Sequence, residues 1–250
     1  MSDLYVERWG SGTPVVLVHG SLATGADEWQ AQRPLADQGF QLLVFDRRGY
    51  GRSPAASGED FVRDGEDIAG LIGDGAHLLG HSYGGFGVLC AAARRPEATL
   101  SVTLLEPGAF GLGQRNPAGR VFLDDVRHLW EQDLPDDEWV VRFLKIVGSA
   151  DALSQELLDA AVPLVPVLRQ GRPPWDPALP LTELASARFA KLVVSGGHSE
   201  ALDAICDDVA ERIGASRMVV KGAGHEIQFA GAPLNEALLA LWRTSSSVKS

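Results

Sequence analysis

The chain has 250 residues, of which 45% are hydrophobic, enough for one large α/β domain or for such a domain with an insertion. Its net charge is −11, and its basic residues gather only in short pairs such as Arg47-Arg48. This balance argues against nucleic acid or an anionic membrane surface as a partner. We expect no signal peptide, and no apolar run approaches the roughly 20 residues of a membrane-spanning helix.

The two cysteines, Cys90 and Cys206, fall in helix-like segments without the spacing of a metal site. We expect both to be buried, reduced thiols, which are typical of proteins in a reducing compartment. The sequence therefore favours a cytoplasmic location.

Strand-like runs alternate with helical patterns in the first part of the chain. Residues 15–18 form a continuous apolar, β-branched run, which is typical of a strand buried on both faces. Further strands are predicted at 41–45, 76–79 and 100–105, with a weaker edge strand at 4–9. Helices are predicted at 26–38, 61–72 and 86–95. The alternation predicts an α/β fold with a doubly wound, mostly parallel sheet.

The alternation breaks after residue 111. No strand-like run occurs from 112 to about 184, where helical patterns at 117–132, 136–147 and 154–168 precede a proline-rich stretch at 171–177. We interpret residues 112–184 as an inserted helical cap that divides the core into residues 1–111 and 185–250. Strands then return at 191–195 and 218–221, with helices at 201–213 and 233–242 and a frayed tail at 244–250.

A serine stands between two glycines at a predicted strand-to-helix junction, in Gly80-His81-Ser82-Tyr83-Gly84. Such a turn is tight enough to strain the serine backbone, and a Cβ at either glycine would meet the neighbouring strand and helix. The turn holds Ser82 Oγ at the end of the sheet. It also points the Tyr83 N–H and the helix N-terminus at the group that the oxygen attacks. This arrangement is typical of a nucleophilic serine.

With three further motifs, the serine turn resembles the α/β-hydrolase superfamily, and the resemblance covers nearly the whole chain. The other motifs are His19-Gly20, Asp46-Arg47-Arg48-Gly49-Tyr50-Gly51-Arg52-Ser53 and Gly222-Ala223-Gly224-His225. The resemblance implies a capped serine hydrolase, similar to esterases and lipases, with Ser82 as nucleophile and His225 as base. It also implies an oxyanion hole built from the backbone N–H groups of Ser21 and Tyr83, with Leu22 as the alternative to Ser21.

The remaining histidines near these motifs are interpreted as structural. His19 is expected to hydrogen-bond loop backbone, and His81 to be packed, because adjacent strand residues point to opposite faces. His198 follows a strand and could line the site, but we favour an exposed loop position. The arginines of the 46–53 loop are expected to anchor that loop: Arg47, Arg48 and Arg52.

The acid of the triad departs from the common pattern of the superfamily. The usual position is a Gly-x-x-Asp after the strand at 191–195, where this chain reads Gly196-Gly197-His198-Ser199-Glu200. Counted from Gly196, the acid position holds Ser199, which cannot serve. Counted from Gly197, it holds Glu200.

A second acid position is known in the fold, at the end of the strand that follows the serine strand. Glu106 is there, 24 residues past Ser82 (106 − 82). A glutamate that ends an apolar strand needs a partner, because burial of an unpaired carboxylate is costly, and a protonated His225 would be that partner. We therefore expect Glu106 as the acid, with Glu200 as the main alternative and Asp203 as another.

These features predict a cofactor-free, metal-free serine hydrolase. The substrate is expected to be a small to medium, mostly apolar carboxylic ester, lactone or thioester, cleaved through an acyl-enzyme by a monomer or homodimer. Apolar side chains of the cap are expected to form the pocket, with Phe110 and Leu112 at its entrance. A serine in place of an aspartate disfavours epoxide hydrolysis and dehalogenation.

Several alternatives are left open by the sequence. C–C bond hydrolysis, perhydrolysis and cyanohydrin cleavage use the same triad. A ligand-binding or signalling protein without turnover would share the fold, and so would a biosynthetic enzyme confined to carrier-bound thioesters.

Overall fold

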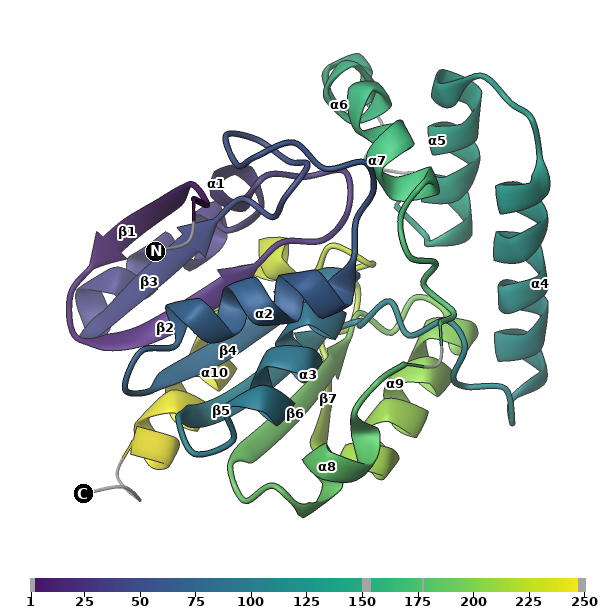
Figure 1. Cartoon of the computed structure of the whole chain (residues 1–250). Coiled ribbons are helices and arrows are strands. Elements are labelled where there is room, and N and C mark those ends of the chain that lie inside the picture. The colour runs from purple at the N-terminus through teal and green to yellow at the C-terminus, as the bar shows by residue number, and fades with distance from the viewer. Residues whose placement is uncertain (1–2, 150–153, 177, 247–250) are drawn as a thin grey trace.

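The structure, a computed structural model, describes residues 3–149, 154–176 and 178–246. Its described strands form one seven-stranded sheet with the order β1-β3-β2-β4-β5-β6-β7 (Figure 1). β1 pairs antiparallel with β3, and the other neighbours pair in parallel. The strands are β1 (Val6–Gly10), β2 (Thr13–Val18), β3 (Phe40–Phe45), β4 (Ala76–His81), β5 (Thr99–Leu105), β6 (Ala190–Ser195) and β7 (Ser216–Val219). The predicted α/β fold with a mostly parallel sheet is confirmed.

Helices cover both faces of the sheet, as the continuous apolar strands require. Alternate residues of β2 belong to different cores: Val16 and Val18 lie in one apolar cluster, and Val15 and Leu17 in the other. The first cluster lies under α2 (Phe61–Leu71), α3 (Gly84–Arg94), α8 (Leu181–Ser186) and α9 (Glu200–Ile213). The second lies under the 3₁₀ helix η1 (Gln30–Gln38) and α10 (Ala232–Ser246).

The strand order places two loops side by side at the carboxyl end of the sheet. The chain leaves β2 toward β3 on one side, and then returns to add β4 on the other side of β2. In the parallel register Val18 lies opposite Gly80, so the loops after β2 and β4 emerge next to each other. Such a reversal of strand order is where α/β sheets bind their ligands.

The predicted helix at 26–38 is wrong as a single element. A short helix, α1 (Gly25–Glu28), ends at Trp29, and η1 follows it. Pro34 lies inside η1, where its missing N–H and fixed φ disfavour a regular α-helix. The proline therefore explains why the predicted helix does not form as one element.

Helices from the middle of the chain stand together to one side of the sheet (Figure 1). They are α4 (Pro117–Glu131), α5 (Asp136–Ile146), α6 (Gln155–Ala161), the 3₁₀ turn η3 (Val162–Leu164) and α7 (Val165–Arg169). The continuous helix predicted at 154–168 is divided into three pieces, because Pro163 and Pro166 each remove a backbone donor.

The end of the chain differs from its predicted form. Helix α10 continues through Ser246, so Thr244 is helical and not part of a frayed tail, while residues 247–250 lie outside the described part. Among the described helices, none combines the length and the apolar composition needed to cross a membrane.

Candidate active site

Ser82 occupies a strained turn between β4 and α3. Its φ is +48°, a region that residues other than glycine rarely adopt. A Cβ on Gly80 would lie 2.8 Å from Val88 Cγ2, and a Cβ on Gly84 would lie 2.4 Å from the His19 carbonyl oxygen. Both glycines are therefore required by close approach of the chain, and the turn presents Ser82 at the carboxyl end of the sheet.

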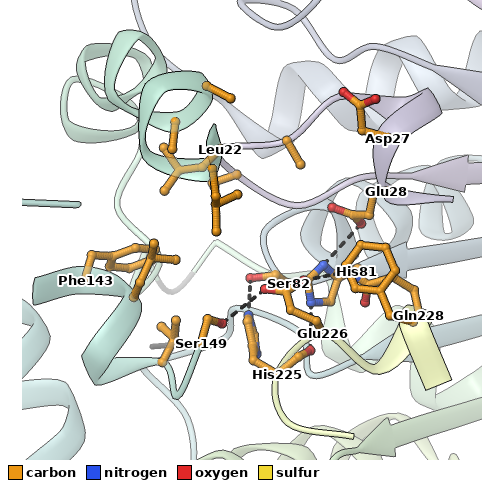
Figure 2. Close-up of a pocket in the computed structure, with 18 of the residues that line it drawn as sticks. Leu22, Asp27, Glu28, His81, Ser82, Phe143, Ser149, His225, Glu226 and Gln228 are labelled. Carbon is orange, nitrogen blue, oxygen red and sulfur yellow. Dashed lines mark hydrogen bonds and ion pairs between the residues drawn. The ribbon is translucent and has the colours of Figure 1, made fainter. Parts of the chain in front are cut away.

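His225, on the loop between β7 and the 3₁₀ turn η4 (Ile227–Ala230), joins Ser82 to Glu106. Its Nε2 lies 3.2 Å from Ser82 Oγ, and its Nδ1 lies 2.7 Å from Glu106 Oε2 (Figure 2). Because a carboxylate only accepts, Nδ1 carries the proton and Nε2 is free to accept one from the serine hydroxyl. The side chains of His225 and Glu106 are buried, at 5% and 1% exposure.

Glu106 follows β5 directly, at a φ of +35°. Its Oε1 accepts a hydrogen bond from the Gly196 N–H at 2.7 Å, which leaves Oε2 for His225. Burial raises the pKa of Glu106, but hydrogen bonds and charge from His225 and the Gly196 N–H outweigh it, so the pKa falls below its usual 4.5. The carboxylate is therefore ionised at neutral pH and stabilises positive charge on His225.

The two other predicted acids lie elsewhere. Glu200 is exposed at the first turn of α9, where it accepts a hydrogen bond from Asn116 Nδ2 at 3.2 Å. Asp203, also on α9, accepts a hydrogen bond from Ser195 Oγ. Of the three acids weighed from the sequence, the structure brings Glu106 to His225.

The two backbone N–H groups predicted for the oxyanion hole belong to Ser21 and Tyr83. Ser21 follows His19-Gly20 and lines the pocket, and Tyr83 caps helix α3. Neither N–H donates a hydrogen bond to an atom of the described chain. A Cβ on Gly108 would lie 3.3 Å from the Tyr83 nitrogen, so glycine at 108 leaves that donor uncovered.

A buried arginine, Arg47, hydrogen-bonds to the backbone of the loop that carries Ser21. Arg47 donates from Nε to the His19 carbonyl and from Nη2 to the Gly20 carbonyl, both at 3.0 Å. It also forms ion pairs with Glu59 and Asp64, at 2.9 and 2.8 Å. Glu59 in turn accepts from Ser21 Oγ at 2.9 Å. The arginine thus anchors both its own loop and the loop after β2.

Replacing Arg47 with alanine is expected to lower the free energy of unfolding by about 3–5 kcal/mol, because two buried carboxylates lose their countercharge. Equilibrium urea denaturation measures the change. Arg94→Ala serves as the control, since the exposed pair of Arg94 with Glu66 contributes at most about 1 kcal/mol. Equal losses in the two variants would contradict the anchoring role of Arg47.

The pocket above Ser82 has a volume of about 440 Å³. Much of its apolar wall comes from α5 and α6, which contribute Leu144, Leu157 and Phe143, the last labelled in Figure 2. The prediction that Phe110 and Leu112 line the entrance is wrong. Neither lines this pocket, and Phe110 is buried against Phe122 with ring centroids 4.9 Å apart.

Carboxylates outnumber cationic groups in the pocket lining, where the buried His81 is paired with Glu28. Asp27 and Glu156 are exposed at its rim, and Glu226 lies deeper beside His225. Burial raises the pKa of Glu226, but the nearby His81 and His225 and the donors Gln228 and Ser149 lower it below 4.5 overall. No lysine or arginine is among the described residues that line the pocket. Within the described chain no group of three or more metal-ligating side chains could hold a metal ion.

The other histidines near Ser82 and His225 form more hydrogen bonds and ion pairs than the sequence indicated. His19 hydrogen-bonds loop backbone as expected. His198 lies at an exposed loop position, as predicted, although its side chain is only 18% exposed. Its Nδ1 lies 3.5 Å from Glu106 Oε1, and its Nε2 lies 3.2 Å from the carbonyl oxygen of Val147, at the end of α5. His81 is buried, as predicted, but forms an ion pair with Glu28 next to Ser82. Glu28 was missed, because a glutamate in a predicted helix is usually solvated and its partner is 53 residues away.

Comparisons with known proteins place the fold among hydrolases. The model described as "Alpha/beta hydrolase family" matches residues 15–237. A non-heme chloroperoxidase, CPO-A1, of Kitasatospora aureofaciens is 37% identical over 126 residues, which is 47% of this chain and 46% of the relative. The bifunctional esterase/perhydrolase DCH of Acinetobacter calcoaceticus is 32% identical over 138 residues, half of each chain.

The matched stretches thus span about half the length of these curated relatives. Among solved structures, the carboxylesterase CesB (YbfK) of Bacillus subtilis superposes with a TM-score of 0.71 at 21% identity, covering 95% of this chain and 87% of that one. At that identity the likeness concerns the fold.

Proposed function

This chain belongs to the alpha/beta hydrolase family, and we propose that it is a cofactor-free serine hydrolase of small to medium, mostly apolar carboxylic esters, lactones or thioesters. The observation that carries the proposal is the continuous relay from Ser82 through His225 to Glu106 at the floor of a pocket. Family membership alone would leave the chemistry open, because one fold serves many reactions.

The reaction begins with attack of Ser82 Oγ on the substrate carbonyl, while His225 Nε2 takes the hydroxyl proton. Glu106 holds the neutral imidazole with its Nε2 lone pair toward the serine and stabilises the imidazolium that forms. The N–H groups of Ser21 and Tyr83 hold the oxyanion. His225 returns the proton to the leaving group, and a water activated by the same imidazole then releases the acyl group.

The helices of residues 112–184 act as a cap in this proposal. Its support is that much of the apolar wall of the pocket comes from α5 and α6, opposite Ser82. A volume of about 440 Å³ suits an acyl group and leaving group of modest size. Perhydrolysis is the second candidate activity, because one curated relative is named an esterase/perhydrolase.

Location and assembly follow as further proposals. A cytoplasmic location is supported by Cys90 and Cys206, which are both free and buried. We expect a monomer or homodimer that acts on a small molecule and binds neither nucleic acid nor membrane, in keeping with a net charge of −11.

A panel of p-nitrophenyl esters of increasing acyl length tests the proposed activity. We expect turnover of short and medium chains that saturates with substrate concentration. Tight binding without turnover across the panel would instead favour a ligand-binding protein, and activity confined to carrier-bound acyl groups would favour a biosynthetic thioesterase. Perhydrolysis is tested separately, by measuring the peracetic acid formed from acetate and hydrogen peroxide.

The pocket charge predicts a preference between two matched substrates. p-Nitrophenyl hexanoate and the p-nitrophenyl monoester of adipic acid differ by a terminal carboxylate, which finds no lysine or arginine among the described residues that line the pocket. We expect kcat/KM to be about tenfold lower for the adipate ester, a modest effect because Asp27 and Glu156 are exposed and screened. The difference in kcat/KM between the two esters should become smaller at high salt concentration, because salt screens the repulsion between carboxylates. Equal or faster turnover of the anionic ester would contradict this preference.

A further inference from the structure

Two buried side chains beside the triad, Glu28 and His81, have no part in the mechanism above. Glu28 lies on α1 and is 3% exposed, and both of its carboxylate oxygens accept from the Gly20 N–H, at 3.2 and 3.0 Å. Its Oε1 also lies 3.1 Å from His81 Nδ1. The other ring nitrogen of His81, Nε2, lies 3.1 Å from the backbone carbonyl oxygen of His225. Figure 2 shows His81 between Glu28 and His225.

Both ring nitrogens of His81 face acceptors, so both must carry a proton. Burial lowers the pKa of His81, but the charge and hydrogen bond of Glu28 outweigh it, and the pKa rises to about 9. The other titratable groups that face His81 are Glu226 and His225 on the loop after β7, Glu106 after β5 and His19 after β2. His81 is thus an imidazolium at neutral pH.

The pair connects three backbone segments whose relative positions matter for the reaction: the Gly20 loop, the Ser82 turn and the His225 loop. Glu28 accepts from the N–H of Gly20, and the next residue, Ser21, carries the proposed oxyanion donor. His81 itself precedes Ser82, and its second N–H fixes the carbonyl of His225. A Cβ on Gly20 would lie 3.1 Å from His81 Nδ1 and 3.2 Å from Ser82 Cβ, so these parts are in close contact.

We propose that Glu28 and His81 form a positioning link that sets the oxyanion loop and the His225 loop against Ser82, and this proposal rests on the serine hydrolase function proposed above. The pair is better suited to fixing position than to adding stability, because a buried ion pair gains little over apolar residues of the same size. A displacement of about 1 Å in a reacting group can cost about 10²-fold in rate.

Two substitutions of Glu28 separate linkage from charge. Glu28→Ala removes both hydrogen bonds of the link. Glu28→Gln keeps them, since its carbonyl oxygen accepts from Gly20 and its amide donates to Nδ1 of a neutral His81, which still donates from Nε2 to His225. We expect Glu28→Ala to lower kcat about 10- to 100-fold with KM changed by less than about threefold. Glu28→Gln should stay within about threefold of wild-type kcat at pH 7.

The pH profile gives a readout that a merely structural role would not move. We expect the kcat of the wild type to fall as pH rises through about 9, because His81 then loses a proton and one of its two hydrogen bonds opens. In Glu28→Gln, His81 is already neutral at pH 7, so this alkaline step should disappear. Asp67→Ala is the matched control, because Asp67 is also buried and ion-paired, with Arg48 at 2.7 Å, but does not line the pocket. We expect it to keep wild-type kcat.

Ester turnover and the rate of Ser82 labelling by a fluorophosphonate are measured on each variant, with thermal unfolding as a check of folding. If Glu28→Ala matches the active wild type, or if both Glu28 variants lose kcat equally, the link is overturned while the hydrolase function stands. If the wild type neither turns over esters nor labels, the hydrolase function fails and the link fails with it. If Glu28→Ala does not fold, the proposal is tested instead by an NMR pH titration of the His81 imidazole in the wild type. A titration near pH 9 supports the link, and one near 6.5 overturns it.

Discussion

Replacing Ser82 with alanine is expected to abolish ester turnover, with a fall in kcat of about 10⁶, as found when a triad serine acting with its base is removed. The residual rate would come from the oxyanion donors and the pocket. The fold should persist, because alanine is smaller than serine and the strained φ of +48° is set by the glycines around the turn. Initial rates with a p-nitrophenyl ester and a circular dichroism spectrum measure the two effects.

His225→Ala provides the control for the Ser82 variant. Because the two side chains act as one unit, each single variant and the double variant should reach the same low rate. Turnover near the wild-type rate in Ser82→Ala would mean that another group is the nucleophile. Losses that simply multiply in the double variant would mean that Ser82 and His225 act independently.

Replacing Glu106 with glutamine is expected to lower kcat by about 10⁴ with little change in KM, the size found for the matching amide substitution in a well-studied triad. The glutamine carbonyl would keep the hydrogen bond from Gly196, which turns the amide NH₂ toward His225 Nδ1. His225 would then carry its proton on Nε2, facing Ser82, and could not act as a base.

Glu200→Gln is the matched control for the acid, because Glu200 was the main alternative and is exposed on α9, with a hydrogen bond from Asn116. Its kcat should stay within a few-fold of wild type. If Glu200→Gln is inactive and Glu106→Gln is active, the acid of the triad is Glu200, after β6, and not Glu106. Activity in both would mean that no single acid dominates, and would favour the ligand-binding alternative.

Much of the fold was predictable because its signals are local. The apolar runs of β2 and β5 and the Gly-x-Ser-x-Gly turn need only neighbouring residues to be recognised. The contact of Glu106 with His225 was predicted from the resemblance to the superfamily, which implies both positions, together with the need of a carboxylate that ends a buried strand for a partner. Two predicted helices are shorter in the structure because prolines interrupt them, Pro34 in the first and Pro163 and Pro166 in the second.

The parts of the site that sequence reasoning missed depend on contacts between distant segments. Glu28 and His81 meet across 53 residues, and His198 meets the Val147 carbonyl across 51. Each of these side chains has an ordinary alternative as a solvated or packed residue. Nothing in the spacing of the sequence separates the two possibilities, because the choice is made by how the loops at the carboxyl end of the sheet pack together.

The most direct test of the serine mechanism is to treat the protein with a fluorophosphonate and map the modified residue by peptide mass spectrometry. Such a probe bonds only to a serine activated by a base and an oxyanion hole. The relay of Ser82, His225 and Glu106 predicts one modified residue, Ser82, together with loss of ester turnover, and no labelling of Ser82→Ala. Labelling of a different serine in active protein, or full turnover after Ser82 is modified, would contradict the account.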